Sequence, residues 1–100
     1  MRLYDIAHGR TGDKGATSNI SVIAYRVEDW PLIEREVTAE RVSEIFGGLP
    51  VTRYVLPRLQ ALNFVIEGAL KGGVTRSLAL DAHGKALSFA VLEMELPDSD

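Results

Sequence analysis

The chain has 100 residues, of which 46% are hydrophobic and 25% are charged, and its formal net charge is -3. This composition excludes disorder and has room for one domain, residues 1–100, which at this size buries roughly 60–70% of its unfolded surface. The lack of cysteine excludes disulfides, thiolate nucleophiles and cysteine-type zinc sites, and with two histidines we expect no metal site. The acidic balance argues against nucleic acid as a partner.

The N-terminal residues MRLYDIAHGR lack the apolar run of a signal peptide. No stretch approaches the roughly 20 apolar residues that span a bilayer. We therefore expect a cytoplasmic protein without membrane contact. The sequence also predicts no cofactor.

In chain order, residues 2–8 alternate loosely and predict a first strand. Residues 9–18 are rich in glycine and polar side chains, which predicts a loop. The β-branched residues within 19–27 predict a buried strand. Asp29 is expected to cap a short helix opened by Pro31, and Thr38 to cap a second helix that Gly47 and Gly48 end.

A third strand is expected at residues 51–56, and the apolar stripe of residues 59–71 predicts a third helix, ended by Gly72 and Gly73. The chain is then expected to close with a hairpin. Its strands would span residues 75–81 and 85–96, joined by a turn at His83 and Gly84. The fold class is therefore α+β, with a single mixed or antiparallel sheet and helices on one face.

One face of the expected final hairpin is small and mostly apolar, whereas a solvated face normally carries Lys and Glu. It would show Thr75, Ser77, Ala79, Ala86, Ser88, Ala90, Leu92 and Met94. We expect a second copy or another subunit to cover it, and two-fold pairing makes a homodimer the simplest assembly. A different register, or cover by the chain's own first strand, would account for the same pattern.

The polar segment from His8 to Asn19 is the most distinctive chemistry of the chain. Its glycines Gly9, Gly12 and Gly15 could expose successive N–H groups as an anion-binding nest. Arg10 and Lys14 add cationic donors, and Asp13 could hold one of them or act as a base. Further hydrogen-bonding groups come from Thr11, Thr17, Ser18 and Asn19. The segment lacks the phosphate-loop pattern GxxxxGK[ST], and a tight β-connection that only satisfies its own amides is the structural alternative.

Other candidates are single residues. His8 beside the polar segment could contact a ligand or act as a general base, whereas His83 beside Gly84 is expected to be a turn residue. Asn63 could face the same pocket or cap a helix, and Arg76 could pair with a carboxylate or lie at a partner interface. Trp30 and Phe64 are expected to be core or interface anchors. No Ser-His-Asp or paired-carboxylate constellation can be assembled, so the catalytic residues remain unknown.

Three stretches of the chain together resemble a known family. They are AHGRTGDKGATSNISVIAY, VTAERVSEIFGG and LPRLQALNFVIEGALKGGVTRSLALDAHGKALSFAVLEMEL. They resemble the ferredoxin-fold domain of proteins similar to AtuA, the acyclic terpene utilisation family, over nearly the whole chain. The resemblance implies a ferredoxin-like sandwich and a domain that occurs as part of a longer protein or as a separate short chain. It also implies a role in the catabolism of acyclic terpenes or other acyl-CoA compounds.

Two hypotheses of different classes follow. In the first, the chain is a small subunit that completes an acyl-CoA-processing enzyme of the hydratase or dehydratase type, beside a large AtuA-like partner, and is not catalytic alone. In the second, it is a non-catalytic assembly domain that forms a homo-oligomer and binds a small anionic ligand. The proposed ligand or partner contacts are His8, Arg10, Thr11, Gly12, Asp13, Lys14, Gly15, Asn19, Asn63 and Arg76.

Overall fold

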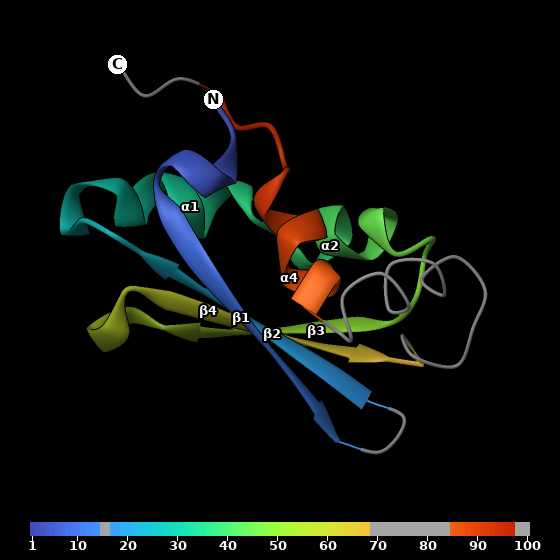
Figure 1. Ribbon diagram of the computed structural model, residues 1–100. Coiled ribbons are helices and arrows are strands. Elements are labelled where there is room, and N and C mark those ends of the chain that lie inside the picture. Colours follow the sequence, from blue (N-terminus) through green and yellow to red (C-terminus); the bar gives the residue numbers. More distant parts are fainter. Residues whose placement is uncertain (15–16, 69–84, 98–100) are drawn as a thin grey trace.

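A computed structural model describes residues 1–14, 17–68 and 85–97 and places them in one α+β sandwich (Figure 1). The strands are β1 (Ala7–Lys14), β2 (Thr17–Ala24), β3 (Val51–Leu56) and β4 (Ala61–Glu67). The helices are α1 (Trp30–Glu36), α2 (Ala39–Ile45) and α4 (Lys85–Leu92). The described strands pair antiparallel in the order β1-β2-β4-β3, and the helices lie on one face. The expected fold class, a ferredoxin-like sandwich with helices on one face of a single sheet, is confirmed.

The first two helices begin and end as the sequence predicts. Pro31 lies in the first turn of α1, and Asp29 occupies the N-cap position, although its side chain makes no capping hydrogen bond. Thr38 caps α2, since its side chain accepts a hydrogen bond from the Arg41 N–H at 3.1 Å. The chain leaves α2 through Gly47 and Gly48, which both have positive φ, and the strand predicted at residues 51–56 is confirmed.

The expected first strand and polar loop are wrong. A short 3-10 helix, Leu3–Asp5, stands where the strand was expected, and the polar segment is an antiparallel pair made of β1 and the start of β2. Glycine is needed at one of these strand positions because a helix packs over it. A Cβ on Gly9 would lie 3.3 Å from the Cβ of Ser88 in α4. Close approach, rather than a loop conformation, explains this glycine.

The helix expected at residues 59–71 is also wrong, because residues 61–67 form β4, an inner strand of the described sheet. Leu62, Phe64 and Ile66 are buried and alternate with more exposed neighbours, which is the period of a strand. Aromatic and β-branched residues favour that period in the middle of a sheet. The same apolar positions also fitted a helical stripe, so periodicity alone did not separate the two structures.

The strand expected at residues 85–96 is replaced by α4, which lies across β1 and β2. Leu87, Ser88, Val91 and Leu92 are buried, whereas Phe89 is 56% exposed, and this spacing is helical. The small apolar hairpin face therefore does not form. The expected strand at residues 75–81, with Thr75, Arg76, Ser77 and Ala79, and the turn at His83 and Gly84 lie outside the described residues.

The core lies between the sheet and the helices. Its fully buried side chains include Leu3, Ile20, Val22, Ile33, Val42, Phe46, Leu62, Phe64, Ile66, Leu87 and Val91. Trp30 and Phe64 both belong to this core, as the sequence predicts. No helix in the described part of the chain is long and apolar enough to cross a bilayer. The hydrophobic contacts thus occupy one face of the sheet, and the other face carries the polar segment.

Candidate functional site

The sheet face opposite the helices, which we call the open face, carries most of the polar side chains of the strands. Thr11 faces the helices, since its Oγ1 accepts a hydrogen bond from the Ser88 N–H at 3.2 Å. Successive residues of a strand point to opposite faces, so the residues on either side of Thr11 belong to the open face. By strand register, the described residues of this face are His8, Arg10, Gly12, Thr17, Asn19, Ser21, Ile23, Thr52, Tyr54, Leu56, Ala61, Asn63, Val65 and Glu67.

A row of four hydrogen-bonding side chains crosses the centre of the open face. Arg10 pairs with Ser21, Ser21 with Asn63, and Asn63 with Tyr54, so one residue comes from each strand. Adjacent strands lie about 4.8 Å apart, which makes this row roughly 14 Å long. The Asn63 Nδ2 donates to Ser21 Oγ at 3.0 Å. We call Arg10, Ser21, Asn63 and Tyr54 the central row.

A second amide extends this network toward the hairpin end of the sheet. The Asn63 Nδ2 also lies 3.5 Å from Asn19 Oδ1, so it contacts two acceptors on β2. On its other side, Asn19 lies over Gly12, where an added Cβ would come within 3.3 Å of the Asn19 Nδ2. Gly12 therefore leaves room for the Asn19 amide on the open face. The two amides and Ser21 form one connected polar group.

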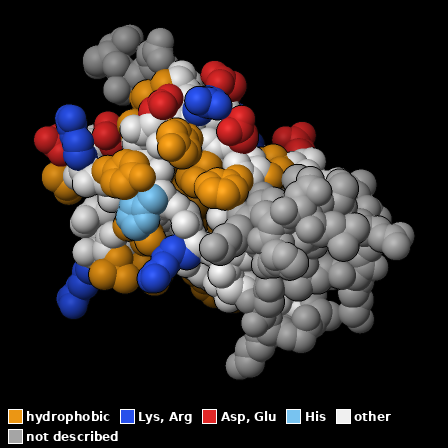
Figure 2. Space-filling view, viewed as in Figure 1, with side chains coloured by type: hydrophobic (Ala, Val, Ile, Leu, Met, Phe, Trp, Pro, Cys, Tyr) orange, Lys and Arg blue, Asp and Glu red, His pale blue; other side chains and the backbone are white. Residues whose placement is uncertain are grey.

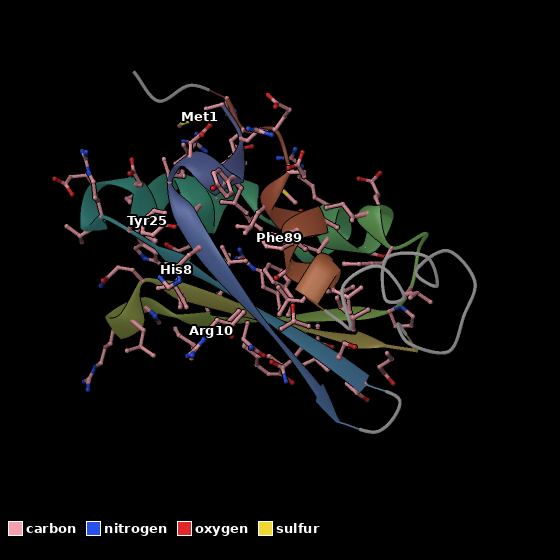
Figure 3. All side chains as sticks on the ribbon, viewed as in Figure 1. Met1, His8, Arg10, Tyr25 and Phe89 are labelled. Carbon is pink, nitrogen blue, oxygen red and sulfur yellow. The ribbon has the colours of Figure 1, made fainter. Side chains whose placement is uncertain are left out.

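An aromatic pair borders the central row on its other side. The rings of His8 and Tyr25 stack with centroids 5.1 Å apart and an angle of 29° between their planes. Tyr25 is 62% exposed, and Tyr54 at the far end of the row is 52% exposed. Figure 3 shows His8, Arg10 and Tyr25 along β1 and the adjoining end of β2. The open face thus combines exposed rings with partly buried amides.

Most of the described carboxylates lie on the helix side of the molecule, where several of them pair with arginines. The Arg10 side chain is exposed and forms no ion pair or hydrogen bond with any described residue. The acidic residues of the helix layer include Glu34, Glu36, Glu40, Glu44, Glu93 and Glu95. In Figure 2 the acidic side chains gather in the upper part of the view, over the helices. The described part of the open face has one carboxylate, that of Glu67 at the end of β4.

The structure brings together five of the residues selected from the sequence. His8, Arg10, Gly12, Asn19 and Asn63 all lie on the open face. Of the other candidates, Thr11 faces α4, Asp13 and Lys14 are described only as the last backbone positions of β1, and Gly15 and Arg76 lie outside the described residues.

The predicted anion nest is contradicted by the strand. In β1, successive N–H groups alternate in direction and form ladder pairs with β2, so they do not converge on one ligand. Sequence reasoning also missed Ser21, Tyr25 and Tyr54. An available signal was the alternation of Asn19 and Ser21 with the apolar Ile20 and Val22, which is the pattern of a strand with one polar face.

The open face can bind and orient a polar group. Arginine, amide and phenol side chains donate hydrogen bonds to carboxylates, phosphates and carbonyls. The nearest partner of Ser21 Oγ is the Asn63 amide, which donates to it and does not remove a proton. Among the described residues, no three His, Asp or Glu side chains are placed to hold a metal. The arrangement suits recognition of an anionic or polar partner.

Comparison with known proteins identifies the family. The model of the AtuA ferredoxin-like domain matches residues 1–97, which is nearly the whole chain. No curated protein and no solved structure matches the chain. The match agrees with the resemblance seen in the sequence motifs and with the observed α+β sandwich. The chain therefore belongs to the AtuA ferredoxin-like domain family.

Proposed function

We propose that this chain is a small accessory subunit that docks its open face onto a large AtuA-like protein. The observation that carries the proposal is the central row, in which Arg10, Ser21, Asn63 and Tyr54 stand in register across all four described strands. The described helices all lie on the other side of the sheet. A face with this pattern is suited to a protein partner.

The residue types of the open face support docking. A solvated sheet face is usually covered by charged side chains, whereas this one has exposed tyrosines, an arginine and partly buried amides. Tyr and Arg are enriched among the residues that contribute most to binding at protein interfaces. The stacked pair of His8 and Tyr25 is already ordered, which lowers the entropy cost of association.

The chemistry of the central row supports an accessory rather than a self-sufficient role. Arginine, asparagine and tyrosine side chains orient and polarise a bound group, but proton transfer near neutral pH usually relies on His or a carboxylate with a tuned pKa. In the proposal, the large partner supplies the acid and base groups and the pocket for the acyl chain. The small subunit supplies hydrogen-bond donors at the junction.

The proposed substrate class is supported by the family resemblance and by the charge of the open face. Members of this family are expected to act in acyl-CoA catabolism, and we extend this to a hydratase or dehydratase-type reaction of the complex. Coenzyme A esters carry phosphates, and Arg10 is an exposed cation without a carboxylate partner among the described residues. In the complex, Arg10 would contact such an anion at the junction of the two proteins.

The same observation favours a second candidate function. Arg10 beside the two asparagine amides could bind a small anion in the absence of any large partner, and the chain would then act as an assembly domain. The two functions differ in where binding occurs. A subunit needs its partner before it binds the ligand, whereas an assembly domain binds the anion alone.

The test is co-expression of the chain with a large AtuA-like protein, followed by co-purification and titration with an acyl-CoA. Wild-type chain is expected to co-purify, and Arg10→Glu to reduce the affinity for the partner by about tenfold or more, because it reverses the charge of the exposed cation at the β1 end of the central row. Arg35→Glu changes an exposed arginine of α1 and serves as the control. We expect the complex to bind and convert the ester and the isolated chain to bind it weakly or not at all.

Three results would contradict the proposal. Equal partner binding by the Arg10→Glu and wild-type chains would exclude the open face as the docking surface. Tight ester binding by the isolated chain without turnover would favour the assembly domain. Turnover by the isolated chain would show that it is a self-sufficient enzyme.

A further inference from the structure

The turn between β3 and β4 is held in a strained conformation that exposes apolar side chains. Gln60 has φ 48° and ψ 49°, the only positive φ of a residue other than glycine in the described part of the chain. Its Nε2 donates to the Pro57 carbonyl at 3.1 Å and lies 3.4 Å from that of Arg58. A left-handed conformation is unfavourable for such a residue and persists only where surrounding contacts impose it. The turn Pro57–Gln60, the η3 turn, is therefore rigid.

The η3 turn presents an apolar surface with a positive charge. Leu59 is 65% exposed and Leu56 is 40% exposed, and residues 55–59 line an open depression of about 470 Å³. Arg58 is exposed beside them and forms no ion pair with a described residue. Clusters of exposed large apolar side chains on small domains mark interaction sites. A fitting partner surface would be apolar and edged by carboxylates.

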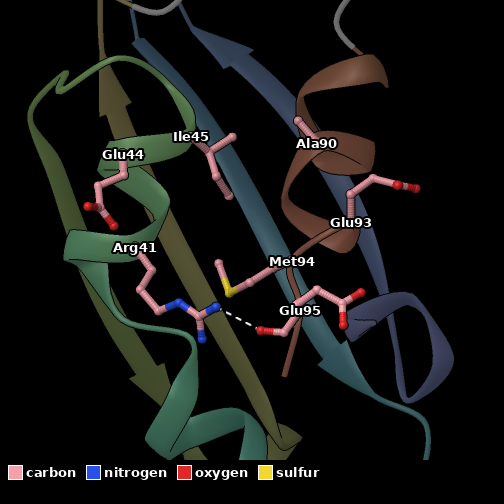
Figure 4. A pocket seen from close by; sticks show the side chains of 7 residues that line it. All are labelled: Arg41, Glu44, Ile45, Ala90, Glu93, Met94 and Glu95. Carbon is pink, nitrogen blue, oxygen red and sulfur yellow. Dashed lines mark hydrogen bonds between the residues drawn. The ribbon is translucent and has the colours of Figure 1, made fainter. Parts of the chain in front are cut away.

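This chain carries such a surface elsewhere, between α2 and the end of α4. This groove has a volume of about 410 Å³, and Figure 4 shows the side chains that line it. Its apolar lining residues are Ile45, Ala90 and Met94, and its carboxylates are Glu44, Glu93 and Glu95. The Arg41 guanidinium is already engaged, since it donates to the Glu95 carbonyl at 2.7 Å, and the Glu93 carboxylate accepts from the Arg2 Nη1 at 3.4 Å. We call this the α2–α4 groove.

We propose that the η3 turn of one copy of this chain docks into the α2–α4 groove of a second copy. Leu59 then covers the apolar lining, and Arg58 pairs with the carboxylate of Glu44 and lies beside that of Glu93. The complementary charge and polarity of the two surfaces carry the proposal. The turn and the groove lie on different parts of the molecule, with the turn at the left end of the sheet and α2 and α4 above its right half (Figure 1). The contact is head-to-tail and leaves the open face unoccupied.

A mixing experiment tests this contact, because each copy uses two different surfaces. Leu59→Asp disables the turn, and the double variant Glu44→Arg/Glu93→Arg disables the groove. Matched controls are Val27→Asp, at an apolar position that is 64% exposed, and Glu40→Arg/Glu28→Arg, at exposed carboxylates. We expect light scattering at millimolar concentration to show oligomers for the wild type and the controls and monomers for each disabled variant. Mixing the two disabled variants should restore a species of two chains, since one intact turn then meets one intact groove.

The outcomes decide the proposal. A monomeric wild type at millimolar concentration overturns it, as do disabled variants that remain oligomeric or a mixture that stays monomeric. Circular dichroism checks that each variant is folded, and Arg58→Glu replaces Leu59→Asp if that variant fails to fold. The experiment uses the chain alone, so its result is independent of the docking of the open face onto a large protein.

Discussion

Gly12 and Asn19 show how a single small residue shapes the open face. Gly12 lies beside the Asn19 amide, and the space that a Cβ would need is taken by that amide. The glycine is consequently a packing requirement and not a flexible loop position. Its role is linked to Asn63, because the same Asn19 amide contacts the Asn63 Nδ2 through its oxygen.

Gly12→Ala is expected to displace the Asn19 side chain, because the new Cβ would come within 3.3 Å of its amide nitrogen. The side-chain amide resonances of Asn19 and Asn63 should shift in NMR spectra, with little loss of stability. Gly48→Ala serves as the control, because it introduces backbone strain without crowding. The φ of Gly48 is +91°, which is strained for alanine, whereas nothing lies within 4 Å of the new Cβ. It should cost about 1–2 kcal/mol and leave both amides unchanged. Unshifted amide resonances in Gly12→Ala would contradict the packing role.

At the scale of elements, the end of α1 depends on a side chain from a strand. The Arg53 Nη1 donates to the carbonyls of Glu34 at 2.7 Å and Val37 at 3.0 Å. The last carbonyls of a helix have no partner within the helix, so this guanidinium satisfies them and fixes α1 against the sheet. Nothing in the local sequence of α1 indicates this contact, because Arg53 lies 19 residues after Glu34 and 16 residues after Val37.

Arg53→Met should lower the free energy of unfolding by about 1.5–3 kcal/mol, since it removes two charged hydrogen bonds from partly buried carbonyls. Arg35→Met removes an exposed arginine from the same helix and should change stability by less than about 0.5 kcal/mol. Urea unfolding of the two variants measures the difference. Similar small losses in both would mean that Arg53 does not hold the end of α1.

The elements predicted correctly from the sequence are those whose ends are marked by nearby proline, capping or glycine residues. Pro31, the Thr38 cap and the glycine pair after α2 are local, so α1, α2 and the strand at residues 51–56 were predicted correctly. The apolar positions in segments 59–71 and 85–96 fitted both a helical repeat and a strand repeat. Packing against the rest of the molecule determines that the first contains the strand β4 and the second the helix α4. The glycine-rich β1 had no strand signal, since Gly9 is required by α4, far away in sequence, and Gly12 by Asn19 on the paired strand β2.

The candidate site was predicted only in part, because some of its residues are neighbours in sequence and others are brought together by strand pairing. Composition was enough to select His8, Arg10 and Asn19 as polar residues close in sequence. Their arrangement on one face, and their union with Tyr54 and Asn63, require the strand pairing. Pairing across strands joins residues far apart in the chain, which single-sequence patterns do not reveal.

At the scale of the whole molecule, we assign different interactions to the helix layer and to the open face. The helix layer is acidic and contains the α2–α4 groove, whereas the open face carries Arg10, the amides and the exposed tyrosines. A large partner on the open face and a second copy at the η3 turn would occupy separate surfaces. The central claim is that the open face docks onto the large partner.

Hydroxyl-radical footprinting of the chain alone and in the co-purified complex tests that claim most directly. Tyr25 and Tyr54 lie on the open face and are 62% and 52% exposed, and Tyr4, away from it, is 53% exposed and serves as the internal control. Oxidation of Tyr25 and Tyr54 should fall severalfold in the complex, because the partner excludes water from their rings, while oxidation of Tyr4 stays the same. Unchanged oxidation of Tyr25 and Tyr54 in a complex that protects Tyr4 would contradict the account.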